Sequence, residues 1–437
     1  MVNLFGKTRA MAATVAVAGA LFSTQSSAVV VVGGSDGWEV SFDGNVNAFY
    51  TVGNYDANYV TEPNDVDSAR VHSGYLPAFF SFNVKSPTVN GMTGGARISF
   101  APTIHTSGSK TQFHINDNDD GNPGISGSNI DTREVVATLS GAFGEISFGR
   151  TLSLFGRQAI LSDMTLYGVG FVPGGDHFGS ITFGRAGHGY TYPDFAASFI
   201  YTTPNIAGWQ ASIGVFDPST ISANTVSSPL IVAPINSGLG LLDEVDSPRF
   251  EVEASYSTSF ANGSYKIWID GMWQDTDSSC TGTVAVVGVG NVACGSMTTS
   301  AYGLGGKFNW QAMELVGYYH NDEGVGLMTQ FSADAVAVDE NGSMDAREGE
   351  GYYIQGTYMV GGNTKLGVSY GENKLENAGG NYVVGAGDIK RELWTVGVYH
   401  DVSSWLKLVA EYNRGELDTG CITPNADTLS VGGFLFW

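Results

Sequence analysis

Strict alternation of apolar and polar residues recurs along the chain and constrains its fold more than any other feature. From Trp38 to Ala48 the apolar residues occupy even-numbered positions, and Glu39, Asp43 and other polar residues occupy odd-numbered ones. The segments 249–256 and 406–413 repeat the pattern. A period of two predicts β-strands with one apolar and one polar face.

The alternation predicts an all-β chain with sixteen strands. Their connections alternate between short turns, such as Ala261-Asn262-Gly263, and long stretches rich in Gly, Asp, Asn and Ser. An even number of tilted strands with short turns at one end and long loops at the other is typical of a transmembrane antiparallel β-barrel. We expect strands at 37–52, 74–85, 94–106, 131–140, 144–150, 190–202, 208–217, 248–260, 264–275, 298–309, 312–321, 350–360, 363–373, 390–402, 405–415 and 427–437.

Residues 1–28 have the order of a secretory signal peptide. Lys7 and Arg9 precede the apolar run 10–22, and small residues end the segment at Ala28. We therefore predict an exported domain over 29–437. No apolar run in the remainder is long enough for a membrane-spanning helix.

The charge balance is acidic. The 43 acidic and 20 basic residues give a net charge of −23, or about −25 without the signal peptide, because that segment carries two bases and no acid. A nucleic-acid partner is therefore not expected, since such binding needs a basic surface. Charged residues make up only 14% of the chain, which suits apolar outward faces in lipid.

The last predicted strand places Leu429, Val431, Leu435 and Trp437 on one face and polar residues on the other. A final aromatic strand of this kind is a feature of outer-membrane barrels, where the barrel-assembly machinery reads it. We expect Trp437 to contribute to that contact.

Two segments carry a resemblance to a known family. Thr132–Arg150 contains an Arg, the turn Gly141-Ala142-Phe143-Gly144 and a final Gly-Arg, and Tyr201–Trp209 follows as a second turn. These segments and the C-terminus resemble the trimeric general porins of Gram-negative bacteria. The resemblance implies a homotrimer in the cell outer membrane, in contact with lipid and lipopolysaccharide. It also implies a long third loop folded into the pore, which passes ions and small hydrophilic solutes by diffusion.

The inward set of side chains follows from parity along each strand. A polar interior of both signs is what a water-filled channel of about sixteen strands requires. The predicted lumen-lining residues are Glu39, Asp43, Glu251, Glu253, Lys266, Asp270, Lys307, Glu314, Lys407 and Glu411.

The resemblance also implies a constriction, with acids on the third loop facing bases on the wall. The loop candidates are Asp163 and Asp176, and the basic candidates are Arg97, Arg133, Arg150 and Arg157. Arg133 and Arg150 share parity with lipid-facing residues, which counts against them unless they lie at strand ends. Because predicted inward acids outnumber bases by two and the loops are acidic, we expect a weak preference for cations.

Export favours disulfide formation, and we expect Cys280 and Cys294 to close a small loop. The pairing of Cys421 stays open, as do alternative pairings of the three cysteines.

No motif for enzymatic chemistry is present in the sequence. It has no G-x-S-x-G, P-loop or HExxH motif, and the acidic run 116–121 lacks the ligands of a calcium loop. We expect a non-enzyme with no cofactor and no metal.

Two alternatives to the diffusion porin remain. A secreted β-sandwich or adhesin would also show alternation, but it would not need detergent for extraction. A substrate-specific channel would keep the barrel and add an aromatic slide, yet parity places few aromatic residues inside beyond Trp268, Tyr318 and Tyr353.

Overall fold

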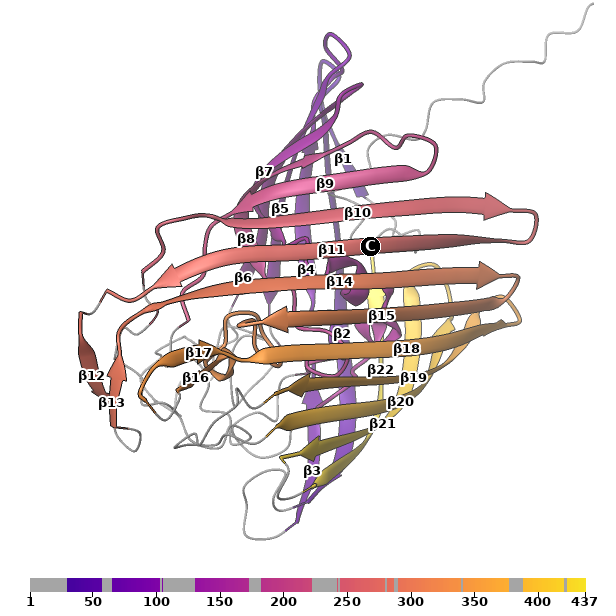
Figure 1. Ribbon diagram of the computed structural model, residues 1–437. Coiled ribbons are helices and arrows are strands. Elements are labelled where there is room, and N and C mark those ends of the chain that lie inside the picture. The colour runs from indigo at the N-terminus through magenta and orange to yellow at the C-terminus, as the bar shows by residue number, and fades with distance from the viewer. Residues whose placement is uncertain are drawn as a thin grey trace, which may run out of the picture.

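The computed structural model describes residues 30–56, 65–102, 104, 130–172, 182–221, 242, 244–279, 281–286, 290–338, 341–376, 388–419 and 423–437. Antiparallel strands dominate this part of the chain (Figure 1). The strands of the main sheet are β1 (Val30–Gly33), β2 (Glu39–Tyr55), β3 (Val66–His72), β4 (Phe79–Lys85), β5 (Thr93–Pro102), β6 (Ile130–Gly141), β7 (Gly144–Leu152), β8 (Phe195–Thr202), β9 (Trp209–Phe216), β10 (Arg249–Phe260), β11 (Gly263–Asp277), β14 (Ser296–Trp310), β15 (Met313–Glu323), β18 (Glu348–Val360), β19 (Thr364–Leu375), β20 (Ile389–Asp401), β21 (Leu406–Asp418) and β22 (Asn425–Phe436).

The main sheet closes on itself as a barrel. From β4 onward each strand of the main sheet pairs with the next one, and β22 pairs with β2 in the register Asn45↔Phe436 to Tyr55↔Ala426. The short strand β1 lies against the start of β2, while β3 and β4 share one position beside β2. Within the described residues the closed wall therefore has sixteen positions, as the alternation predicts.

The wall is apolar outside and polar inside. On β2, Val46 and Tyr50 are exposed, whereas Asn47 and Thr51 are buried. On β22, Leu429 is half exposed, and Ser430 next to it is fully buried. This polarity is the reverse of a soluble sandwich, whose two sheets bury apolar faces against each other. The β-sandwich alternative is therefore wrong.

The barrel closes around the last residue. Gly44 and Trp437 exchange backbone hydrogen bonds of 3.1 Å, and the Trp437 ring packs 5.1 Å from that of Phe80. A Cβ on Gly44 would lie 2.3 Å from the carbonyl oxygen of Phe79 and 2.6 Å from the Trp437 ring. Glycine is thus required where β2, β4 and the C-terminus meet.

The second wall position departs from the sequence prediction. A single strand is expected at 74–85, but β3 and β4 are separated by residues 73–78, which leave the wall. Asn47 holds this bend, since its side chain donates to Leu76 O at 2.9 Å and accepts from Gly74 N at 2.7 Å. The bend is buried, so its apolar residues Tyr75 and Leu76 contribute to the interior.

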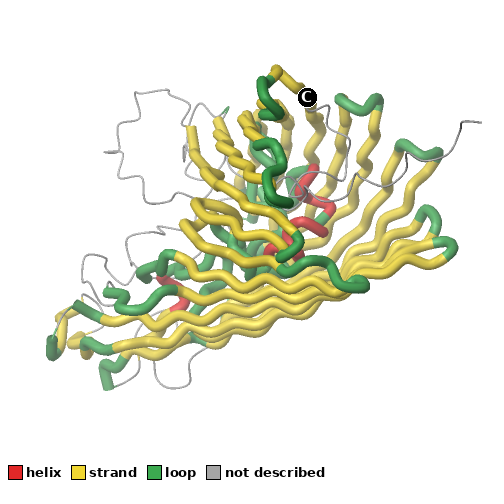
Figure 2. Tube along the Cα trace, turned by 90° about the horizontal axis from the view of Figure 1, so that it is seen from above, coloured by secondary structure: helices red, strands yellow, loops and turns green. Residues whose placement is uncertain are grey.

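The chain between β7 and β8 turns into the barrel. It contains α2 (Arg157–Ser162) and the 3-10 helix η1 (Met164–Tyr167), and Figure 2 shows helical segments lying among the strands of the wall. We call residues 153–172 and 182–192 the inner segment. The predicted strand 190–202 accordingly begins later, at Phe195.

The long connections carry additional small elements. Two hairpins form, one from β12 (Thr283–Val286) and β13 (Gly290–Ala293), and one from β16 (Val336–Val338) and β17 (Met344–Ala346). A short 3-10 helix, η2 (Ala333–Ala335), precedes β16. These elements lie at the end of the barrel opposite the short turns, in agreement with the predicted alternation of connections.

Candidate pore constriction

The inner segment is attached to β10 by two carboxylates. Glu251 accepts hydrogen bonds from the backbone N–H groups of Leu154 at 2.6 Å and Phe155 at 2.9 Å. Glu253 accepts two hydrogen bonds from the Arg157 guanidinium, at 2.9 and 3.1 Å. Glu251 and Glu253 thus hold the start of the inner segment from the inner face of β10. Arg157, expected among the bases of the wall, instead lies on α2, in the inner segment itself.

A third carboxylate attaches the segment to the far wall. Glu411 on β21 accepts from the N–H groups of Val169 and Gly170, both at 2.8 Å, and from the Tyr399 hydroxyl at 2.5 Å. A Cβ on Gly168 would lie 1.8 Å from the Glu411 carboxylate, so glycine permits this close approach. Because β10 and β21 lie on different sides of the ring, the segment crosses the lumen.

The middle of the segment rests on β18 and on the bend 73–78. The Gln355 side chain accepts from Met164 N at 2.7 Å and the Tyr353 hydroxyl donates to Ala159 O at 2.8 Å. From the other side, Tyr75 N donates to Gly168 O at 2.9 Å. These contacts narrow the passage at the level of α2 and η1.

Asp163 lies inside this narrowing but faces no open space. Its side chain is fully buried, caps η1 through Thr165 and accepts from the Tyr190 hydroxyl at 2.9 Å. The Arg185 guanidinium lies 3.9 Å away. Asp163 therefore organises the inner segment instead of presenting a free charge to the passage, and Asp176 lies outside the described residues.

Arg97 and Arg133 both point into the barrel and both are paired. Arg97 on β5 bonds Asp43 and Glu134, each at 2.8 Å. Arg133 bonds Asp131 at 2.9 Å and the Tyr192 hydroxyl at 3.2 Å.

Parity gives the wrong face for Arg133 because β6 contains a bulge. Ser99 opposes Glu134 while Phe100 opposes Thr132, so Arg133 is the extra residue. A bulge lets two consecutive side chains share one face, and both Arg133 and Glu134 are buried. Glu134 is absent from the predicted lumen residues, although the regular parity of β6 places it inside: Val135 next to it is exposed and Val136 is buried.

Arg150 is not part of this group of paired side chains. It opposes Val135 and Ala197 in the register of β7, and both of those residues are exposed on the outer wall. This placement agrees with the parity argument against Arg150.

The remaining lumen candidates lie on the inner wall at the end of the barrel that carries the short turns. Lys266 donates to Gln158 Oε1 at 2.7 Å, and Lys307 pairs with Glu314 at 2.7 Å. Lys407 pairs with Asp401 at 2.6 Å. Glu39, at the exposed start of β2, opposes Lys85 in the register.

Asp270 belongs to a buried aromatic stack on the inner wall. It accepts from the Tyr318 hydroxyl at 3.1 Å; the Tyr318 ring stacks on that of Trp268 at 6.4 Å and lies tilted against that of Tyr353 at 6.4 Å. Parity correctly places these three aromatic residues inside. The inner segment covers them, since each is at most 4% exposed, so they do not form an open aromatic slide.

Two further residues anchor the inner segment from within it. Arg185 donates to Leu393 O and Thr395 Oγ1, both at 3.0 Å, and to Ser369 Oγ. His188 is buried against Phe171, with ring centroids 4.7 Å apart. Burial, together with the positive charges of Arg391 and Arg185, lowers the pKa of His188 well below its usual value. A single sequence offers no signal for these long-range contacts.

Cys294 is disulfide-bonded, and its N–H donates to Gly282 O at 2.9 Å beside the β12–β13 hairpin. Cys280 lies outside the described residues, so the pairing of Cys280 with Cys294 stays a prediction.

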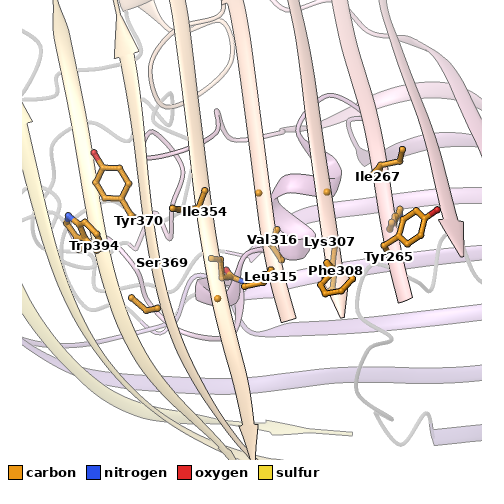
Figure 3. A pocket seen from close by; sticks show the side chains of 16 residues that line it. Tyr265, Ile267, Lys307, Phe308, Leu315, Val316, Ile354, Ser369, Tyr370 and Trp394 are labelled. Atoms are coloured by element: carbon orange, nitrogen blue, oxygen red, sulfur yellow. The ribbon is translucent and has the colours of Figure 1, made fainter. Parts of the chain in front are cut away.

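A separate groove lies on the outer wall, not in the passage. It has a volume of about 540 Å³ and crosses neighbouring strands from β11 to β20 (Figure 3). Gly306, Gly317 and Gly356 form its floor, and exposed apolar side chains such as Ile267 and Ile354 flank it.

Two searches concern other kinds of site. No described helix is both long and apolar enough to cross a membrane. Within the described ranges, no group of three or more His, Cys, Asp or Glu side chains could hold a metal ion.

The comparison with known protein families gives a match over most of the chain. A family model described as Gram-negative porin matches residues 10–420, and the chain therefore belongs to the Gram-negative porin family. Its place is the outer membrane, and its function is that of a diffusion channel. No curated protein matches the sequence at a significant level.

Solved structures agree with this assignment. The outer-membrane channel DcaP of Acinetobacter baumannii is 14% identical with a TM-score of 0.64, covering 93% of this chain and 100% of that one. An anion-selective porin from Comamonas acidovorans is 16% identical with a TM-score of 0.58, covering 92% and 100%. OmpT of Vibrio cholerae, in a trimer form, is 14% identical with a TM-score of 0.52, covering 92% and 100%. At these identities the likeness concerns the fold.

Proposed function

We propose that this porin is a homotrimer in which ions and small hydrophilic solutes diffuse through a passage narrowed by α2 and η1, with a weak preference for cations and no enzymatic activity. The observation that carries the proposal is the position of the inner segment. It is held from β10 to β21 by Glu251, Glu253 and Glu411. A charged wall on both sides of a narrowing favours a hydrated path over a packed core.

The trimer is supported by the unequal lengths of the strands, which make one side of the wall lower than the other. Strands β4, β8 and β9 have 7, 8 and 8 residues, whereas β11 and β14 have 15 each. A tilted strand needs about 9–11 residues to cross a bilayer. The low wall nevertheless exposes Phe82 and Phe199, at 56% and 68%. Neighbouring copies packed against this wall would cover these apolar side chains.

The glycines at 303–306 give less support to trimer packing than their sequence suggests. A Cβ on Gly303 would meet Tyr318 and Asp270, and one on Gly305 would meet Trp268 at 2.1 Å. Both glycines thus make room for inward side chains, and of the three glycines only Gly306 lines the outer groove.

A weak cation preference is supported by the pairing of the interior arginines with carboxylates. Arg97 lies between two carboxylates, while Arg133 and Arg157 each pair with one. Their fields are largely cancelled, and the excess of acids in the chain as a whole then favours cations at the mouths.

Contacts with lipopolysaccharide and with the barrel-assembly machinery belong to the same proposal. The outward residues of β22 and the ring of Trp437 lie at the seam with β2, where the barrel closes. A machine that aligns the two edges before closure would meet this surface.

Two measurements test the proposal. Chemical cross-linking in mild detergent should give trimers, and monomers alone would contradict the assembly. In planar bilayers under a tenfold KCl gradient, the reversal potential should have the sign of a cation-preferring pore and should move toward zero in Asp176→Asn. A wild-type anion preference would overturn the proposed selectivity.

A further inference from the structure

Four lysines lie on the inner wall just below the inner segment. Lys266, Lys307, Lys365 and Lys407 come from β11, β14, β19 and β21, and we call them the lysine row. Each lies within five residues of a short turn. Lys266 contacts Gln158 on α2, and the Lys407 ammonium lies 5.8 Å from the ring centre of Tyr167 on η1. The lysine row therefore contacts both helices from the side of the short turns.

The charges of this wall are not balanced. Glu314 pairs with Lys307 and Asp401 pairs with Lys407. Lys266 has only the neutral amide of Gln158 as its hydrogen-bond partner among the described residues, although Glu253, Arg157 and Lys307 lie near enough to influence it. Glu253 is itself paired with Arg157. Lys365, which is partly buried, has no hydrogen-bond or ion-pair partner there, although Glu314, Lys307, Lys407 and Asp401 lie near enough to influence it.

The geometry brings like charges together. Lys266 and Lys307 are directly opposite in the register of β11 and β14. Opposed residues of one face have Cβ atoms about 4.5–5.5 Å apart, and like charges there are unfavourable unless an anion lies between them. Two or more ammonium groups can thus reach the same anionic group.

We propose that the lysine row is a binding site for small solutes with several negative charges on carboxylate or phosphate groups, which pause there after passing the constriction. The inference rests on the proposed channel function and names a substrate class for it. Charge-assisted hydrogen bonds from several lysines would favour such solutes over chloride. Most of the current of small ions would still pass the remaining lumen.

The test is block of KCl current in planar bilayers by citrate and, separately, by inorganic phosphate, each added to either side in turn. Wild type should show block by at least one of them, stronger from the side of the short turns. In the double variant Lys307→Gln with Lys365→Gln, the blocker's dissociation constant should rise by a factor of about ten or more, because the variant loses charged hydrogen bonds.

The matched control is Lys390→Gln, which also removes a positive charge. Lys390 lies on the outer face of β20, paired with Glu392 at 3.1 Å, and block should stay as in wild type. Absence of block by both anions, or equal block in the double variant and wild type, would overturn the proposal. An open channel for KCl in the double variant would leave the proposed function standing, so the two failures are distinguishable.

Discussion

Arg157 on α2 and Glu253 on β10 form a two-point ion pair across the lumen side of the barrel, with N–O distances of 2.9 and 3.1 Å. The guanidinium is 12% exposed and the carboxylate 7%. The pair joins the start of α2 to the strand β10, at the place where the passage narrows.

We predict that Glu253→Gln loosens this end of the inner segment. Removing one partner of a buried ion pair leaves the other charge uncompensated, which costs about 3–5 kcal/mol. Single-channel records should show more frequent transitions between conductance levels than in wild type. Glu372→Gln is the control, because Glu372 lies on the outer face and bonds Tyr370 there. Equally quiet records for Glu253→Gln and wild type would contradict the anchoring role.

Closure of the barrel depends on the absence of a side chain at Gly44. We predict that Gly44→Ala lowers the temperature at which the folded band is lost on unheated gels. The new methyl group would overlap Phe79 O and the Trp437 ring, and overpacking of this kind costs about 1–3 kcal/mol.

The control for Gly44→Ala is Gly306→Ala. A Cβ at Gly306 has no neighbour closer than 3.8 Å. The temperature at which this variant loses its folded band should therefore stay near that of wild type. The same transition temperature for both variants would show that the junction with Trp437 is not tight.

Acidification should weaken the docking of the inner segment through His188. Burial and nearby arginines lower the pKa of this side chain below that of the unfolded chain. The undocked state therefore binds more protons, and docking loses stability as pH falls below about 6.5. Hydrogen–deuterium exchange at residues 182–192, corrected for the intrinsic pH effect, should rise from pH about 7.5 to about 5. In His188→Asn the rise should be smaller, and an equal rise would exclude His188 as the cause.

We predict that Cys280 and Cys294 are joined in the exported protein. Peptide mapping without reductant should recover the two cysteines in one linked pair, and a free thiol at either would contradict this. Reduction should leave the barrel folded, because the β12–β13 hairpin beside Cys294 is not part of the main sheet.

The sequence predicts the wall of this barrel well, because the alternation of apolar and polar residues in each strand indicates which side chains face outward and which face inward. Glu251, Glu253 and Glu411 could be placed inside in this way, and so could Trp268. The bulge at Arg133 and the bend at 73–78 could not be placed from the sequence. Each interrupts the alternation locally and is stabilised by contacts with residues distant in sequence.

The interior partners are harder to predict for a related reason. Asp163 looks like a free loop acid in the sequence, yet Tyr190 and Arg185 bury it. Which carboxylates become anchors and which stay in water depends on how the inner segment crosses the lumen. Alternation carries no information on that path.

The most direct test of the whole account is the conductance of the purified protein in a planar bilayer. A passive, water-filled pore narrowed by the inner segment should give stepwise currents that rise in near proportion to the KCl conductivity and persist without any energy source or added ligand. Absence of steps from correctly folded, membrane-inserted protein, or a conductance that appears only with one added solute, would contradict the account.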